Sequence, residues 1–194
     1  MIGVMVPSVF ALEDKGDFYL IFNSPIYGSD TIENRVNEIN QSYVLQQHIP
    51  IKFQKCGYAN AYWQNSIKTI VMCEELVSRY QEMFGKAFKD DLEMQKRYTL
   101  FAINYVMHHE IGHALVDEYN LPVIGREENF ADRFAAHEMI GEYGGESLAP
   151  AIAWYLGESS YGVIEIFGVD IVMKESVYAG KHNLNEQRGY DMAC

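Results

Sequence analysis

The first quarter of the chain alternates between strand-like and helix-like patterns of apolar residues. Runs rich in aromatic and β-branched residues, or in strict apolar–polar alternation, predict strands at 17–23 and 49–54. Between these runs, apolar residues recur at near-helical spacing, which predicts a helix from Asp30 or Thr31 to about Gln47. Asp30 and Thr31 are both good N-caps, because either side chain can accept a hydrogen bond from the first helical turn.

Two further β-rich runs, 58–63 and 67–73, lie on either side of the turn-like residues 64–66, so we expect a hairpin. Helical patterns then dominate, interrupted by the short loop 121–125 and followed by weak alternation over 161–173. The helical patterns cover about 74–84, 92–118, 127–142 and 146–157. Because strands precede helices, this order predicts an α+β fold with a small antiparallel sheet and a helical C-terminal half, rather than a parallel doubly wound sheet.

Length and composition are those of one globular domain spanning residues 1–194. The chain is 48% hydrophobic, and no run approaches the ~18 apolar residues that a membrane-spanning helix needs. Its 15 Lys+Arg against 27 Asp+Glu leave a net charge of −12. This acidity excludes a nucleic-acid groove, which needs a basic footprint, and disfavours anionic membrane surfaces. No feature of the sequence predicts the oligomeric state.

Residues 2–11 are almost wholly apolar and allow two interpretations. Val9 and Ala11 fit the −3 and −1 positions of a signal-peptidase site, so residues 1–11 are a candidate remnant of an export signal. The basic segment of such a signal is missing and the apolar stretch is short, so a buried first strand is the alternative.

The segment 108–113, His-His-Glu-Ile-Gly-His, carries the clearest chemistry and lies late in the longest predicted helix. It contains H-E-x-x-H as His109, Glu110 and His113. A spacing of four puts both imidazoles on one helix face, within reach of a single tetrahedral cation. Glu110 is displaced by about 100° around the helix, so its carboxylate can reach a water on that cation and serve as general base. A helix with two satisfied surface histidines is the alternative.

A catalytic zinc ion needs three protein ligands and an open position, and the next predicted helix supplies a third candidate. We expect Glu128 to be this ligand, with Glu127 as the alternative, and Asp132 to accept the outer N–H of a liganding imidazole. Alone, these carboxylates would suit a solvated helix N-terminus, where the helix dipole favours acidic residues. Their link to H-E-x-x-H through a short Pro/Gly loop favours the ligand role.

The stretch HEIGHALVDEYNLPVIGREENFADRFA resembles an uncharacterised bacterial family of metallopeptidases with a GHAL helix and an LP-x-x-GREE loop. The spacing of Glu128 and Asp132 is similar to the E-x-x-x-D of thermolysin-like gluzincins. The resemblance implies a zincin-like fold with one zinc ion per chain, bound by His109, His113 and Glu128, with Glu110 as the base of an active-site helix. The pattern E-x-x-A-x-x-F-A, which begins at Glu128, is also similar to metallopeptidase-like regulators of mobile elements.

Residues 60–63, Asn-Ala-Tyr-Trp, are candidates for a substrate-binding edge of the sheet. Zinc peptidases of this class hold an extended peptide by adding it as a strand, which requires free backbone groups, a small residue and a polar side chain. Ala61 and Asn60 supply the last two, and the run resembles the N-A-x-W edge strand of thermolysin-like enzymes. An ordinary aromatic-rich hairpin is the alternative.

Cys56 and Cys73 are a candidate disulfide. A two-residue turn would pair Trp63 with Ser66, and the same register sets the two cysteines opposite each other, within disulfide range. The metallopeptidase family that the chain resembles also has a Cys-Gly pair before the edge strand and a Cys-Glu pair after the next strand. A bridge would contribute about 3 kcal/mol and imply an oxidising compartment, so we expect a periplasmic or secreted protein, with the cytoplasm as the alternative.

A zinc peptidase also needs a donor to the oxyanion that forms during hydrolysis. His182 is the candidate, because the tail resembles a family segment H-x-L-x-E-Q-R-x-Y, in which Arg188 and Tyr190 are the alternatives. A capping and salt-bridging segment accounts for the same residues equally well. Members of that family continue beyond the position of Cys194. This chain is therefore a candidate fragment or shortened member of the family, without full activity.

These features predict a zinc-dependent peptidase that hydrolyses peptide bonds of peptide or protein substrates. The alternative is a zinc-binding regulatory or interaction protein that keeps the metallopeptidase scaffold but does not turn over. The intact Glu110 favours the enzyme, because a purely structural metal has no need of a base beside an open position.

Overall fold

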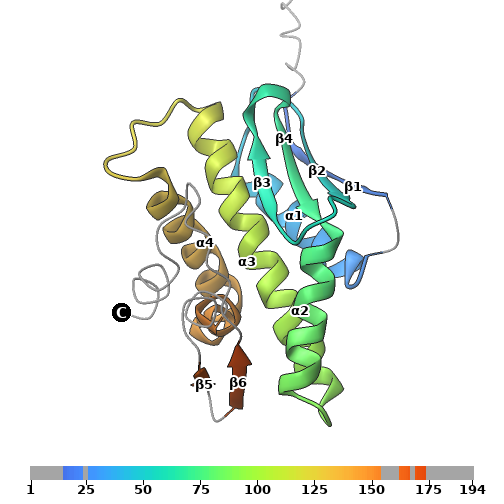
Figure 1. Ribbon diagram of the computed structural model, residues 1–194. Helices are drawn as coiled ribbons and strands as arrows, with labels where there is room; N and C mark the ends of the chain where they lie inside the picture. Colours follow the sequence, from blue (N-terminus) through green and yellow to red (C-terminus); the bar gives the residue numbers. More distant parts are fainter. Residues whose placement is uncertain (1–14, 24–25, 154–161, 167–168, 174–194) are drawn as a thin grey trace, which may run out of the picture.

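A four-stranded mixed sheet forms one layer of the molecule. The computed structural model describes residues 15–23, 26–153, 162–166 and 169–173 (Figure 1). The strands, in the spatial order β1-β2-β4-β3, are β1 (Phe18–Phe22), β2 (Ile49–Gln54), β4 (Thr69–Cys73) and β3 (Ala61–Gln64). β1, β2 and β4 run parallel, and β3 lies antiparallel to β4 at one edge. The α+β class is therefore confirmed, but the expected antiparallel sheet is wrong.

The connection between β1 and β2 explains the parallel strands. α1 (Ser29–Ser42) carries the chain back to the start of β2, because parallel strands require a crossover connection. α1 begins after Gly28, which has a φ of 70°, rather than at an Asp30 or Thr31 cap. The helix also ends earlier than expected, since Leu45 leaves it to form a β-bridge with Gly16.

The hairpin exists, but its register differs from the expected one. The turn is a 3-10 helix, η1 (Asn65–Ile67), followed by Lys68 in the left-handed conformation at φ 48°. These extra residues set Trp63 opposite Ile70 instead of Ser66. Cys73 consequently lies beside Gln54 of β2, and its N–H donates to the Asn60 carbonyl on the other side.

The helices follow the hydrophobic pattern closely. α2 spans Glu74–Ala87, α3 spans Leu92–Glu118, α4 spans Glu127–Tyr143 and the 3-10 helix η2 spans Gly145–Leu148. Residues 149–153 are also helical, and β5 (Gly162–Ile166) pairs antiparallel with β6 (Val169–Met173). Asp91 caps α3 by accepting a hydrogen bond from the Met94 N–H. No helix among the described residues is long and apolar enough to cross a membrane.

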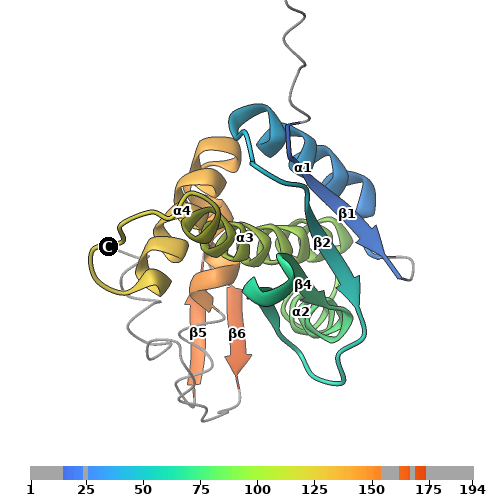
Figure 2. The ribbon, with the colours of Figure 1, turned by 90° about the horizontal axis from the view of Figure 1, so that it is seen from above.

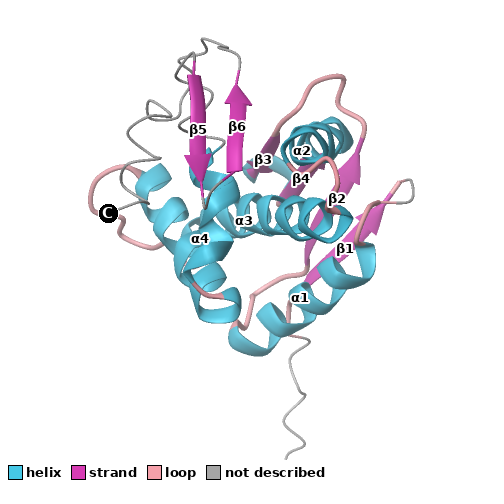
Figure 3. Ribbon diagram, turned by 90° about the horizontal axis from the view of Figure 1, so that it is seen from below, coloured by secondary structure: helices cyan, strands magenta, loops and turns pink. Residues whose placement is uncertain are grey.

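α3 lies in the centre of the molecule, between α4 and the sheet (Figures 1 and 2). α1 and α2 pack on either side of it (Figure 3). Apolar side chains of these helices form one core with Ile49, Ile51 and Phe53 of β2. A second cluster, which includes Phe101 and Met139, fills the space between α3 and α4. A helix buried on nearly every side holds its polar residues in fixed positions, and His109, Glu110 and His113 are on this helix.

Candidate metal centre and sheet edge

The candidate metal centre lies where α3 and α4 pack together, and Gly112 lets them approach closely. A Cβ atom at residue 112 would lie 3.0 Å from the Ala131 Cα and 3.3 Å from a ring carbon of Phe134. The backbone of α4 therefore occupies the space that any larger side chain at residue 112 would need. This contact brings the H-E-x-x-H turn of α3 against the first turns of α4.

Three side chains converge at this contact. The Nε2 atoms of His109 and His113 are 3.1 Å apart, and Glu128 places one carboxylate oxygen 3.4 Å from the former and the other 3.5 Å from the latter. A tetrahedron with metal–ligand bonds of roughly 2.0–2.1 Å has edges of about 3.3 Å. The two imidazole nitrogens and the Glu128 carboxylate thus converge closely enough to bind one tetrahedral cation, and their residue types suit zinc.

The outer nitrogen of each imidazole faces a different carboxylate of α4. His109 Nδ1 lies 3.0 Å from Asp132 Oδ1, and His113 Nδ1 lies 2.6 Å from Glu127 Oε1. The buried Tyr105 hydroxyl donates to the same Asp132 oxygen at 3.1 Å. Carboxylates at Nδ1 keep the proton on that nitrogen, which leaves the Nε2 lone pairs for a metal. Glu127, the alternative ligand, therefore lies behind His113 rather than between the two histidines.

The carboxylates around the imidazoles favour positive charge in the metal-free site. Burial lowers the pKa of His109, but its hydrogen bonds to Asp132 and Glu128 outweigh this effect and raise the pKa to about 9. Burial also opposes a rise at His113, and the bond to Glu128 is the largest of the interactions that nevertheless raise its pKa. A site that stabilises protons in this way also stabilises a metal cation, once the protons have left.

Glu110 points from α3 toward the sheet edge. Its Oε2 accepts a 2.8 Å hydrogen bond from the backbone N–H of Trp63, on β3. The residue is 5% exposed, and its two neighbours in the motif, His109 and His113, are 3% and 9% exposed. The three residues of the motif are therefore buried together beside an edge strand.

The register of β3 determines which backbone groups face this site. Asn60 is hydrogen-bonded to Cys73 of β4, so by the alternation of an antiparallel pair the N–H and C=O groups of Ala61 and Trp63 point away from β4. The bond from Trp63 to Glu110 agrees with this direction. Ala61 is buried and Asn60 is exposed. The structure thus brings the candidate substrate edge next to the candidate base.

Cys56 and Cys73 are joined by a disulfide, with Cα atoms 5.5 Å apart. The bridge ties the loop before β3 to the start of α2. Glu75 strengthens the same connection, because its carboxylate accepts hydrogen bonds from the N–H groups of Cys56 and Gly57. These hydrogen bonds lower the pKa of Glu75.

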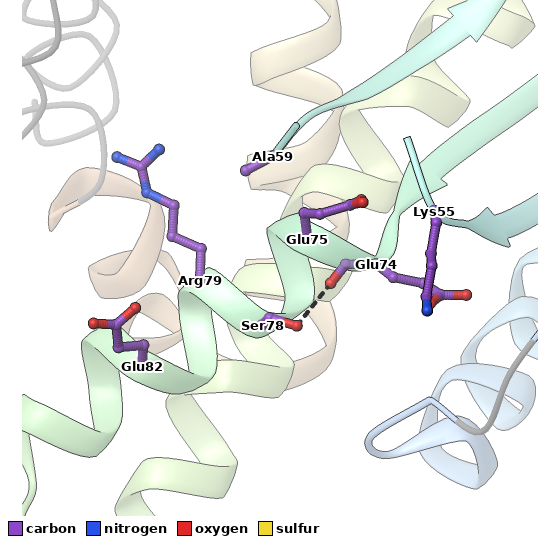
Figure 4. Close-up of a pocket in the computed structure, with 7 residues that line it drawn as sticks. All are labelled: Lys55, Ala59, Glu74, Glu75, Ser78, Arg79 and Glu82. Atoms are coloured by element: carbon purple, nitrogen blue, oxygen red, sulfur yellow. Dashed lines mark hydrogen bonds between the residues drawn. The ribbon is translucent and has the colours of Figure 1, made fainter. Parts of the chain in front are cut away.

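A hollow of about 380 Å³ lies next to this loop, along the outer side of α2 (Figure 4). Its lining is strongly charged and does not include any residue of the candidate metal centre. The lining residues are Lys55, Ala59, Glu74, Glu75, Ser78, Arg79 and Glu82.

The remaining sequence candidates either lie outside the described residues or do not contribute to the centre. His182, the candidate oxyanion donor, and its alternatives Arg188 and Tyr190 lie outside the described residues. His108 lies on another face of α3, about 100° around the helix from His109, and is fully buried; its Nε2 accepts a hydrogen bond from Arg35. His137 is exposed on α4.

Two residues that contribute to the centre, and one backbone contact, are not predicted by the sequence. Tyr105 precedes His109 by one helical turn, so the same spacing of four could have identified it. A glycine inside an otherwise helical pattern indicates close packing, which could have identified Gly112. The contact between the Trp63 amide and Glu110 joins residues 47 positions apart and has no local signal.

A model of the protein family described as "Putative metallopeptidase" (DUF4344) matches residues 21–194. The match includes the whole candidate centre and the edge strand β3. No curated protein and no solved structure matches the chain.

Proposed function

The chain belongs to this family of metallopeptidases, and from this premise we propose that it is a zinc-dependent peptidase. His109, His113 and Glu128 hold the metal in this proposal, and Glu110 is the general base. The observation that carries it is the convergence of these side chains: the two Nε2 atoms are 3.1 Å apart, and each has a Glu128 oxygen within 3.5 Å.

The donor set fits a catalytic rather than a structural metal. Three protein ligands leave one position of a tetrahedron open, whereas structural zinc sites have four. When bound, zinc would lower the pKa of water at that open position and polarise a substrate carbonyl. Asp132 and Glu127 would keep both imidazoles in the tautomer that ligation requires.

Glu110 moves the proton in the proposed hydrolysis. Its Oε2 is held by the Trp63 N–H, and no described residue hydrogen-bonds its Oε1, so this second oxygen is available to the water. Glu110 takes a proton from the attacking water while the new C–O bond forms, and returns it to the leaving nitrogen as the C–N bond breaks.

An extended peptide is the proposed substrate. β3 is an edge strand, and the backbone groups of Ala61 face the centre with no partner among the described strands. A peptide added along this edge would carry its scissile bond past Glu110. The exposed Asn60 lies next to Ala61 and is the proposed side-chain contact to that peptide.

Export is the proposed location. The Cys56–Cys73 disulfide supports it, since disulfides persist in oxidising compartments and are rare in the cytosol. Alkylation of both cysteines in the native protein, without reductant, would contradict this proposal.

The experiment that tests the function compares zinc-loaded wild type with Glu110→Gln on a diverse peptide library, with cleavage detected by mass spectrometry. Glutamine keeps an oxygen for the Trp63 N–H but cannot accept the proton, so we expect cleavage by the wild type alone. Equal cleavage by both would indicate a contaminant. No cleavage by either protein, with one zinc bound per chain, would favour the regulatory zinc-binding protein.

A further inference from the structure

The backbone amide of Trp63 is bound to the candidate base, although it lies on the strand proposed to receive substrate. We propose that this amide is a positioning group for Glu110, so that the free edge of β3 is divided between base and substrate. This inference rests on the proposed function and deepens it. In this division, the backbone groups of Ala61 bind the substrate, and the N–H of Trp63 binds the carboxylate of Glu110.

The N–H of Trp63 makes no hydrogen bond within the sheet. Trp63 stands opposite Ile70 at a position where neither residue donates across the β3–β4 ladder. The N–H therefore points outward, and Glu110 is the acceptor it meets. Hydrogen bonds from a backbone N–H to a carboxylate are among the strong ones in proteins.

The contact restricts the orientation of Glu110. The carboxylate comes from the long central helix α3, and the donor comes from a strand fixed by the β4 ladder, so both partners are on rigid elements. The bond occupies Oε2 and leaves Oε1 without a hydrogen bond from any described residue. A base held in one orientation contributes to rate because it does not have to be ordered during the reaction.

The division of the edge limits how a peptide can pair with it. A peptide that bonded to both groups of Trp63 would have to displace Glu110 from its N–H. In the productive register the peptide uses the N–H and C=O of Ala61 and only the C=O of Trp63. The edge therefore recognises a short backbone segment rather than a long strand.

Proline substitution separates the two roles, because proline removes an N–H and is tolerated where that N–H points away from the ladder. Trp63→Pro removes the donor to Glu110, and Trp63→Ala is the matched control that removes the indole but keeps the donor. Ala61→Pro removes the N–H proposed to bind substrate. Circular dichroism and zinc stoichiometry establish that each variant is folded and loaded.

We expect Trp63→Pro to lower kcat by roughly 10- to 100-fold relative to Trp63→Ala with little change in KM, because the base is no longer held in place. Ala61→Pro should instead raise KM and change kcat less. A rise in KM for Trp63→Pro with kcat unchanged would overturn the inference, since the Trp63 N–H would then serve the substrate.

A second measurement does not depend on turnover or on folding of the proline variant. The Trp63 amide proton should move to higher field and exchange faster in Glu110→Ala than in wild type, with Glu110→Gln between them. An unchanged chemical shift and exchange rate of the Trp63 amide proton in both variants would overturn the inference. If the contact is present and the wild type cleaves nothing, the proposed function fails while the contact stands; cleavage without the contact overturns the inference alone.

Discussion

The two sides of α3 carry adjacent histidines with opposite charge preferences. His108 and His109 are 0% and 3% exposed, yet burial and the neighbouring Arg35 lower the pKa of His108 to about 3, whereas that of His109 is about 9. His108 donates from Nδ1 to the Asn104 carbonyl and accepts from Arg35, so it is neutral. The sign of the surrounding charge, and not burial, separates a packing histidine from a candidate metal ligand.

Both sides are built partly by glutamates of α4. Glu128 faces the candidate metal centre, while Glu138 binds Arg35 at 3.1 Å and accepts a hydrogen bond from the Tyr43 hydroxyl. α4 thus supplies one carboxylate to the candidate site for a metal ion and another to the Arg35 guanidinium. Substitution of Glu128 or Glu138 therefore removes the carboxylate from one of the two sites and leaves the other intact.

The largest effect is expected from Glu128→Ala, which removes one of the three metal donors. Zinc affinity should fall by more than the 10- to 100-fold typical of outer-sphere substitutions, because a direct ligand is lost. Glu138→Ala is the control: it should keep the zinc but lower the free energy of unfolding by about 1–3 kcal/mol, as Arg35 loses an acceptor. Zinc content after dialysis and urea unfolding measure the two effects. Retention of zinc by Glu128→Ala would contradict the ligand assignment.

The pH dependence of stability should differ in sign between the two sides. In the metal-free protein, the pKa of His109 rises from 6.5 to about 9 on folding, so its contribution is complete below pH 6.5 and is lost as pH rises through 9. His108 acts oppositely, because its lowered pKa costs stability as pH falls below 6.5.

Urea unfolding of metal-free protein at pH 6.5 and 9 measures the first of these effects. We expect stability to decrease across this range in wild type and to change less in His109→Gln. The stabilisation by added zinc should increase across the same range, because the ligands must be neutral to bind it. Equal slopes in wild type and His109→Gln would show that another group causes the change.

A smaller effect is expected from the carboxylates behind the imidazoles. Asp132→Asn should weaken zinc binding by roughly 10- to 100-fold, because the carboxylate that orients His109 is lost. Glu127→Gln should weaken it less, since Glu127 is half exposed and water can replace it behind His113. Zinc titration against a competing chelator measures both, and the reverse order would contradict this account.

The convergence of the candidate ligands is easier to predict from the sequence than the sheet is, because the two depend on different distances along the chain. His109, Glu110 and His113 are fixed relative to one another by the helical period, and Glu128 follows after one short loop. The parallel pairing of β1 with β2 depends on where α1 packs, which no local alternation records. The predicted register at Trp63 was wrong for a related reason. The turn forms a 3-10 helix, η1, instead of the expected two-residue turn, and the local sequence does not specify this form.

The smallest effect is expected at the contact between α3 and α4. Gly112→Ala would place a Cβ 3.0 Å from the Ala131 Cα, so α4 must shift and stability should fall by about 1–3 kcal/mol. Gly141→Ala is the matched control, because it lies in α4 with no atom within 4 Å of its added Cβ, and alanine there should stabilise by up to about 1 kcal/mol. A shift of α4 would also move Glu128 relative to the histidines, so Gly112→Ala should weaken zinc binding while Gly141→Ala does not. Loss of stability with unchanged zinc affinity would mean that the centre tolerates a looser helix contact and that its geometry is set by the carboxylate–imidazole bonds instead.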